Sequence, residues 1–319
     1  MSKQNNKNDF ISITDLSVKE TWQILFFAKK LKEELKKTGS NKTILQNKTL
    51  AMIFEKPSLR TRISFEAGMT QLGGHAIYLS PNDIGIRKTE WERESVSDTA
   101  KVVSTMTDMI MARTYSHDTI KKLALSSDIP VINGLSDLEH PCQILADLMT
   151  IWETKGKLKG LTIGYVGDGE NNVTHSLVLA STMLGMNFKC GSPNKFWMKK
   201  EIVDKAIKIA KNNSYIKQTI DPEEAVKETD VVITDTWISM GDEEEKIKRV
   251  QIFQPYQVNK KLMHYAKKDA IFMHCLPAYR NHEVTSEVID GPQSVVLQEA
   301  ENRLHVQKAL MCYLLKVIK

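Results

Sequence analysis

The sequence lacks the features that mark several specialised classes of protein. Its 319 residues include only four cysteines and no CxxC pair, which argues against a structural zinc site and against a disulfide scaffold. No apolar run approaches the roughly 18 residues that a membrane-spanning helix needs. Aromatic residues make up 7% of the chain, and the net charge of +5 is not gathered in a block of lysines and arginines, so nucleic-acid binding is not indicated.

The first residues, MSKQNNKND, are polar and have no apolar core of the kind found in secretory signals. We therefore expect a cytoplasmic protein whose partners are neither a membrane nor a nucleic acid. The mild positive charge fits an anionic small molecule equally well. With 41% hydrophobic and 26% charged residues, the composition is that of an ordinary globular protein, and the length suits two domains of about 150 residues.

Short apolar runs alternate with helical patterns along most of the chain. This alternation predicts βαβ units, and hence an α/β fold with two doubly wound parallel sheets. Apolar residues at three- and four-residue steps add a helix near each chain end, over 14–37 and 301–319. The basic segment 155–160 is the best candidate for a linker. The expected strands are 49–54, 76–80, 109–113, 130–133, 161–166, 188–190, 231–235, 271–275 and 294–297.

The first expected strand runs directly into a motif suited to an anion. Ser58 is a good helix N-cap, and the free N–H groups at a helix start favour a negatively charged ligand. Arg60 and Thr61 add a guanidinium fork and a hydroxyl, which suits a phosphate. Arg62 cannot share a helix face with Arg60. It is more simply explained by an ion pair with Glu66, which lies four residues further on. The alternative is a capped surface helix with solvated arginines.

Three further polar residues stand at the ends of expected elements. Arg113 ends an apolar strand, where a charged side chain is unusual. An anionic ligand would explain its presence there. His140 stands at the entrance of a helix that starts at Pro141, and Gln143 lies one turn in. The alternative for a lone histidine is a residue that only starts the helix.

The second half carries fewer charged candidates. GDGENN (167–172) lacks the third glycine of the GxGxxG pattern, with Asn172 in that place, so a nicotinamide site is not indicated. Asp235 follows a strand and either holds an ammonium group or starts an ordinary turn. His274 and Cys275 would point to opposite faces of a strand, which argues against a Cys–His dyad, and a buried free thiol is the alternative for Cys275. Arg303 is expected near the start of the last helix, where the helix dipole disfavours a positive charge. An anion bound there would explain an arginine at this position.

Taken in order, these segments resemble the motifs of the aspartate/ornithine carbamoyltransferase family, from about residue 16 to residue 315. FEKPSLRTR (54–62) is similar to the family's carbamoyl-phosphate motif, with Leu59 in place of the usual threonine, a small loss if that residue serves through its backbone N–H. HPCQ (140–143), GDGENN, HCLP (274–277) and ENRLH (301–305) match the later motifs. SMG (239–241) resembles the mobile loop of the ornithine-specific members and is not the pattern expected of the aspartate-specific ones.

The resemblance implies a transferase that passes the carbamoyl group of carbamoyl phosphate to the δ-amine of L-ornithine, giving L-citrulline and phosphate in arginine biosynthesis. It implies no cofactor and no metal, and a homotrimer or an assembly of trimers with active sites at subunit interfaces. It also implies a carbamoyl-phosphate domain over 1–152, with the helix 301–319 packed back on it, and an ornithine domain over 153–300.

The resemblance further implies roles for single residues. The expected catalytic residues are Arg60, Arg113, His140, Asp235 and Cys275. The expected carbamoyl-phosphate-binding residues are Ser58, Leu59, Arg60, Thr61, Arg113, His140, Gln143, Cys275, Leu276 and Arg303. The expected ornithine-binding residues are Asn172, Asp235, Ser239 and Met240.

The segment 82–95 departs from the family pattern, because it is longer than the loop that reaches a neighbouring active site in relatives. Arg87, Lys88 and Arg93 are candidates for that role, and an exposed charged loop is the alternative. Two other functions also stay open. One is action on another amine, such as putrescine or an N-acylated ornithine, against which SMG and Asp235 argue. The other is a nucleotide-dependent oxidoreductase or an inactive binding paralogue, against which the broken glycine pattern and the intact motifs argue.

Overall fold

The computed structural model of the chain describes residues 8–80, 83, 94–238 and 246–317. The chain divides into two compact units, which we call the first unit (Met1–Ala146 with Arg303–Lys319) and the second unit (Asp147–Asn302). It passes from the first to the second within helix α5 (Pro141–Lys155) and returns within helix α12 (Val296–Leu314). Sequence patterns place these boundaries at 152/153 and 300/301.

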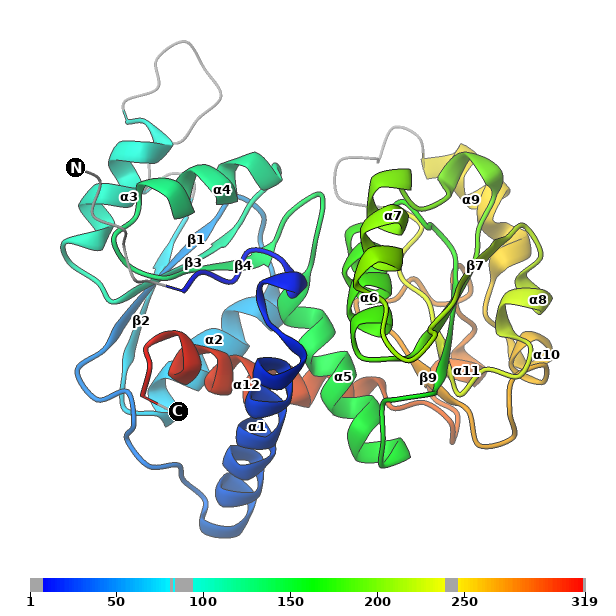
Figure 1. The fold of residues 1–319 in the computed structure, drawn as a ribbon, viewed down its shortest axis with the longest axis horizontal. Helices are drawn as coiled ribbons and strands as arrows, with labels where there is room; N and C mark the ends of the chain where they lie inside the picture. The colour runs from blue at the N-terminus through cyan, green and yellow to red at the C-terminus, as the bar shows by residue number, and fades with distance from the viewer. Residues whose placement is uncertain (1–7, 81–82, 84–93, 239–245, 318–319) are drawn as a thin grey trace. The chain divides into compact units, whose positions relative to one another are not determined.

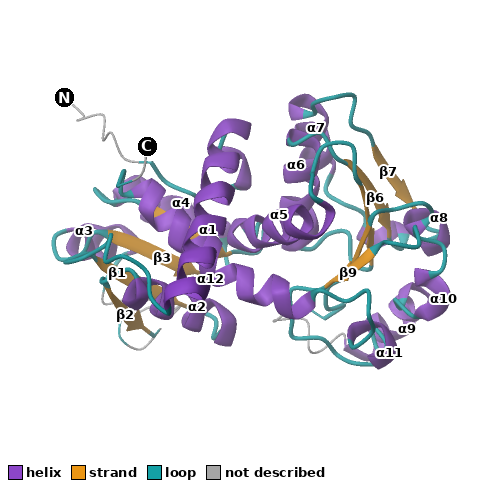
Figure 2. Cartoon of the chain, turned by 90° about the horizontal axis from the view of Figure 1, so that it is seen from below, coloured by secondary structure: helices purple, strands orange, loops and turns teal. Residues whose placement is uncertain are grey.

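The first unit is built on a four-stranded parallel sheet in the order β2-β1-β3-β4. Helices α3 and α4 lie on one face of this sheet, and α1 and α2 lie on the other with the end of α12 (Figures 1 and 2). The strands are β1 (Thr49–Phe54), β2 (His75–Leu79), β3 (Met109–Arg113) and β4 (Val131–Leu135). The helices are η1 (Ile13–Asp15), α1 (Val18–Thr38), α2 (Leu59–Gln71), α3 (Val96–Ser104) and α4 (His117–Ser126).

The second unit is built on a five-stranded parallel sheet in the order β7-β6-β5-β8-β9. Helices α6 and α7 lie on one face, and α8 to α11 on the other (Figures 1 and 2). The strands are β5 (Thr162–Val166), β6 (Asn187–Gly191), β7 (Ile216–Thr219), β8 (Val231–Ile233) and β9 (Ile271–Met273). The helices are η2 (Asn194–Phe196), α6 (Asn172–Met183), α7 (Lys200–Ile209), α8 (Pro222–Val226), α9 (Lys246–Phe253), η4 (Gln254–Tyr256), α10 (Lys260–Met263) and α11 (Ser286–Ile289).

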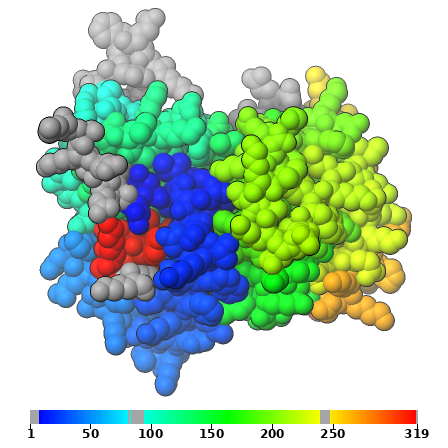
Figure 3. Space-filling view, in the orientation of Figure 1, coloured from blue at the N-terminus to red at the C-terminus, as the bar shows by residue number. Residues whose placement is uncertain are grey.

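The prediction of an α/β fold with two doubly wound parallel sheets is confirmed. The central strands β3 and β5 are buried along their whole length, because helices cover both faces of each sheet. Local sequence explains several helix starts, since Ser17 and Glu20 form a reciprocal capping box at α1. The end of α12, in red, lies beside α1, in blue, on one face of the first unit (Figure 3), where the Tyr313 hydroxyl donates to Glu20.

One expected strand is absent, one expected helix begins earlier than predicted, and one observed strand was not expected. The segment 294–297 is not a strand, because α12 begins at Val296 and Ser294 makes only an isolated bridge to Phe272. The last helix thus starts earlier than expected, and Arg303 lies two turns inside it, where the dipole argument no longer applies. Strand β7 was not expected, because three of the four residues of its sequence IKQT are polar, as suits a strand at the sheet edge. Among the described residues, no helix is both long and apolar enough to cross a membrane.

Candidate active site

The anion motif of the first unit lies where β1 leads into α2. Ser58 caps α2: its Oγ accepts a hydrogen bond from the Thr61 backbone N–H at 3.3 Å and donates to the Thr61 hydroxyl at 3.1 Å. Thr61 is buried, whereas the Leu59 side chain is 69% exposed. Leu59 therefore has only its backbone N–H to offer an anion at this helix start. The predicted N-cap is confirmed.

The two arginines of this motif have different surroundings. Arg62 Nε lies 2.9 Å from Glu66 Oε1, and its guanidinium stands 4.2 Å above the Tyr78 ring, so the predicted structural ion pair is confirmed. Arg60 is half-buried and close enough to His140 to lower the pKa of that imidazole. Of the two arginines, Arg60 is the one whose positive charge acts on His140.

Arg303 joins three helices of the first unit. Its Nη1 donates to Gln143 Oε1 on α5 at 2.6 Å, and its Nη2 donates to Thr61 Oγ1 on α2 at 3.3 Å. All three side chains are buried. Residues that lie up to 242 positions apart in the chain therefore form one connected polar cluster, and each of them was a predicted site residue.

His140 completes this cluster together with Arg113. Arg113 ends the buried strand β3, and both side chains are less than a tenth exposed. Burial, followed by the charges of Arg303, Arg113 and Arg60, lowers the pKa of His140 well below its ordinary value of 6.5. The imidazole is therefore neutral at pH 7. Such a ring donates one N–H without adding to the positive charge.

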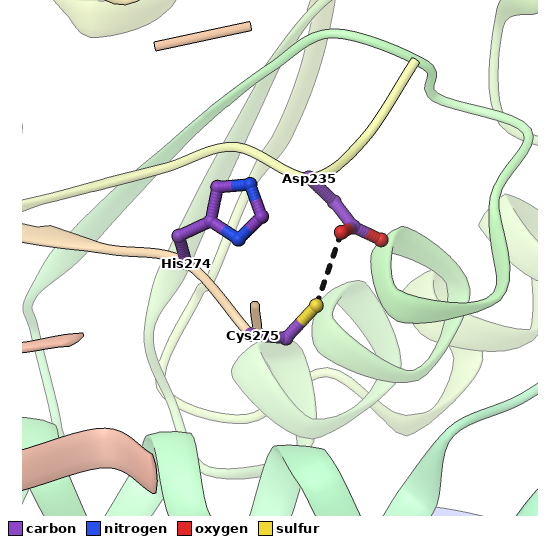
Figure 4. Close-up of side chains that lie close together, drawn as sticks. All are labelled: Asp235, His274 and Cys275. Atoms are coloured by element: carbon purple, nitrogen blue, oxygen red, sulfur yellow. Dashed lines mark hydrogen bonds between the residues drawn. The ribbon is translucent and has the colours of Figure 1, made fainter. Parts of the chain in front are cut away.

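The second unit carries a separate cluster, centred on Asp235, two residues beyond β8. Cys275 Sγ donates to Asp235 Oδ1 at 3.0 Å (Figure 4), and the Thr236 backbone N–H donates to the same oxygen at 2.8 Å. Asn171 Nδ2 donates to the other oxygen, Oδ2, at 2.9 Å. Burial and the neighbouring Asp235 carboxylate raise the pKa of Cys275 well above 9.0, so the sulfur is a thiol at neutral pH.

His274 lies beside Cys275 (Figure 4) but has other partners. Its Nδ1 accepts a hydrogen bond from the Leu276 backbone N–H at 2.9 Å, and its Nε2 lies 3.2 Å from Glu283 Oε1. Glu283 Oε1 also accepts from the Tyr279 backbone N–H at 2.6 Å, which holds the turn that follows β9. The His274 nitrogens are both engaged and cannot take the Cys275 proton. The conclusion against a Cys–His dyad stands, although strand alternation is the wrong reason because β9 ends at Met273.

Asp235, His274 and Cys275 also have the residue types of a metal site, with their ligand atoms within 4.8 Å of one another. Each of these residues nevertheless has a protein partner: Glu283 and the Leu276 N–H for His274, Asn171 and the Thr236 N–H for Asp235, and Asp235 for Cys275. A metal ion would have to replace this set of hydrogen bonds. The arrangement is therefore explained as a hydrogen-bonded carboxylate and thiol.

A buried ion pair stands next to the Asp235 cluster. The Arg249 guanidinium on α9 donates through Nη2 to Asp168 and through Nε to the Trp237 carbonyl, the latter at 2.6 Å. Burial raises the pKa of Asp168 to about 6, against the opposing effect of Arg249. The pair thus ties the segment that follows β5 to the segment that follows β8.

The predicted carbamoyl-phosphate residues are divided between the two units. The first unit contains Ser58, Arg60, Thr61, Arg113, His140, Gln143 and Arg303, and the second contains Cys275 and Leu276. Asn172 is the half-buried first residue of α6. Ser239, Met240 and most of 82–95 lie outside the described residues.

Sequence reasoning missed Asn171 and Arg249. N-cap preference alone would have pointed to Asn171, but no local signal pairs Arg249 with Asp168.

Two parallel α/β units, each with polar side chains gathered beyond the carboxyl ends of its strands, define a two-domain α/β enzyme. Residues 8–153 match the family model described as the carbamoyl-P binding domain of aspartate/ornithine carbamoyltransferase, and residues 159–314 match its Asp/Orn binding domain. The chain belongs to the aspartate/ornithine carbamoyltransferase family, whose members are carbamoyltransferases.

Individual relatives agree with this membership. The chain is 50% identical to an ornithine carbamoyltransferase of Pyrococcus abyssi, over 98% of this chain and 96% of the relative. It is 51% identical to one from Methanospirillum hungatei, over 97% and 99%. The solved structure of ornithine carbamoyltransferase from Pyrococcus furiosus superposes with a TM-score of 0.92 at 48% identity, covering 98% of each chain.

Proposed function

We propose that this protein transfers the carbamoyl group of carbamoyl phosphate to the δ-amine of L-ornithine, giving L-citrulline and phosphate. The observation that carries the proposal is the neutral, buried His140 surrounded by Arg60, Arg113 and Arg303. Three cations around one uncharged donor suit a substrate that bears a phosphate next to a carbonyl group. Family membership adds the substrates, since the matched domains are described by carbamoyl phosphate and by aspartate or ornithine.

In this proposal the first unit binds carbamoyl phosphate. The α2 helix start, which Ser58 caps, holds the phosphate through the N–H groups of residues 59 and 60 together with Arg60 and Arg113. His140, Arg113 and Thr61 donate to the carbonyl oxygen as it gains negative charge. Gln143, held by Arg303, faces the carbamoyl amide.

The second unit binds ornithine in this proposal. Asp235 accepts a hydrogen bond from a substrate amine, and Cys275 helps to orient the δ-amine. Asn172, Ser239 and Met240 bind the amino-acid part. Since Cys275 is a protonated thiol, we assign it a contact with substrate and not a nucleophilic attack.

The chemical step needs no covalent intermediate with the protein. The δ-nitrogen forms a bond to the carbamoyl carbon, the carbon–oxygen bond to phosphate breaks, and the amine releases a proton. Charge stabilisation and alignment of the two substrates supply the catalysis. We propose that the reaction runs without a cofactor, and that it serves arginine biosynthesis, as the name of the anabolic Pyrococcus furiosus relative suggests.

We further propose a cytoplasmic homotrimer or an assembly of trimers. Four free cysteines fit a reducing compartment. Exposed Leu59 and Ile63, four residues apart on α2, offer an apolar strip for a neighbouring subunit. Light scattering of the purified protein tests the assembly, and a monomeric mass at working concentration would reject it.

The decisive experiment measures product formation from carbamoyl phosphate with ornithine, putrescine, N-acetylornithine or aspartate as acceptor. We expect citrulline from ornithine and a much slower reaction with the other three. Preference for putrescine or N-acetylornithine would move the protein to another branch of the family. No reaction with any of the four amines would overturn the proposal.

A further inference from the structure

The Asn171 side chain makes two different kinds of hydrogen bond. Its Oδ1 accepts from the backbone N–H groups of Val173 and Thr174, at 2.8 and 3.0 Å, and so caps helix α6. Its Nδ2 donates to Asp235 Oδ2 at 2.9 Å and approaches the Tyr165 hydroxyl at 3.3 Å. The side chain is 7% exposed. Backbone donors at one end and a carboxylate at the other leave only one consistent orientation of the amide.

Capping alone does not require asparagine. Aspartate, serine and threonine cap a helix about as well. Only asparagine combines an acceptor for the cap with an N–H donor that reaches a second group, because aspartate has no donor and the serine hydroxyl is one bond shorter. The contact with Asp235 is therefore what selects asparagine at this position.

That contact also determines what Asp235 can still accept. A carboxylate has about four acceptor positions, two on each oxygen. Among the described residues, Thr236 and Cys275 occupy both positions on Oδ1, and Asn171 occupies one on Oδ2. One position on Oδ2 is left for a substrate amine. The direction of that position depends on the plane of the carboxylate, which the hydrogen bond from Asn171 fixes.

We propose that Asn171 is a positioning residue for the amine-binding carboxylate Asp235. It acts through Asp235 and does not touch the reacting atoms. The proposal rests on the function proposed above, because it assumes that Asp235 binds the substrate amine.

The test uses two variants that keep the helix cap. Asn171→Asp preserves the size and the cap acceptor but turns the donor into an acceptor opposite Asp235. Asn171→Ser preserves the cap and no longer reaches Asp235. We expect the KM for ornithine to rise about tenfold or more in Asn171→Ser and further in Asn171→Asp. The KM for carbamoyl phosphate, whose proposed phosphate contacts all lie in the first unit, should stay within about twofold, and thermal unfolding should occur within a few degrees of wild type.

Tyr165→Phe is the matched control, because it removes the other neighbour of Nδ2 and leaves the bond to Asp235 in place. We expect a wild-type KM for ornithine in this variant. A wild-type KM in Asn171→Asp, an equal rise of both KM values, or the loss of folding in both cap-retaining variants would each overturn the proposal. Wild-type protein that forms no citrulline would instead reject the underlying function.

Discussion

The Cys275 thiol lies 3.0 Å from Asp235 Oδ1 and donates its proton to that carboxylate. This contact joins the end of β9 to the end of β8, neighbouring strands of one sheet. It also explains why a cysteine so close to a histidine is not a nucleophile. The carboxylate disfavours a thiolate beside it, and the His274 nitrogens are engaged elsewhere.

The first prediction follows from this contact. At pH 7.5, iodoacetamide should alkylate Cys275 slowly, because burial and Asp235 raise the pKa of the thiol. Asp235→Asn removes the charge and should speed the alkylation of Cys275 several-fold, measured by mass spectrometry of the labelled peptide. The buried Cys142, Cys190 and Cys312 serve as internal controls that stay unlabelled in both proteins. Equal alkylation rates would show that Asp235 does not control the thiol.

The second prediction separates the two arginines of the anion motif. Arg60→Ala should lower kcat/KM by about 10²–10³ or more with an intact fold, because it removes a cation from the proposed phosphate and carbonyl site. Arg62→Ala is the matched control. It breaks an exposed ion pair with Glu66, so we expect near-normal turnover and a stability loss of at most about 1 kcal/mol. Near-normal turnover in Arg60→Ala would remove Arg60 from the site.

The third prediction concerns the protonation of His140. Because burial and three arginines lower the pKa of His140 well below 6.5, the neutral ring should persist from pH 8 down past pH 6.5. A change in the KM for carbamoyl phosphate due to this residue should therefore begin only at lower pH. The pH dependence of that KM in wild type and in His140→Asn tests this. A wild-type inflection near pH 6.5 that His140→Asn abolishes would contradict it.

The fourth prediction concerns the buried pair of Asp168 and Arg249. Removing one partner leaves an uncompensated buried charge, so Asp168→Asn and Arg249→Met should each destabilise the second unit by about 3–5 kcal/mol. The double variant should be more stable than the sum of the single losses predicts. Urea unfolding of all four proteins measures the coupling. Additive losses would mean that the two charges do not stabilise each other.

The fifth prediction concerns Lys308, which is buried on α12 and donates to Asn41 Oδ1 at 2.7 Å and to Gln71 Oε1 at 2.8 Å. Burial lowers the pKa of Lys308 from 10.5 to about 8. Between these values the unfolded chain binds the proton that the folded chain has lost, so this group makes the protein more stable as the pH rises from 8 to 10.5. Lys308→Met should lose that slope when urea unfolding is compared at pH 8 and pH 10. An identical slope in both proteins would contradict the assignment.

Local signals in the sequence determined most of the fold. The strands 49–54 and 109–113, the cap at Ser58, the helix start at Pro141 and the pair of Arg62 with Glu66 all depend on residues within a few positions of one another. Periodicity, capping preference and i, i+4 spacing act at that range. Local signals failed at β7, whose sequence is mostly polar, and at 294–297, where the last two residues of an apolar run begin a helix.

The sequence by itself thus determined the fold class, the family and most of the candidate residues. Only the tertiary structure decided which of them touch. Arg303 meets Gln143 from 160 positions away, and Asn171 meets Asp235 from 64 positions away. Strand order creates the second contact, since β5 and β8 are neighbours in the sheet although two strands separate them in sequence. Side-chain hydrogen bonds between such elements depend on how whole helices and strands pack, which no local pattern of residues encodes.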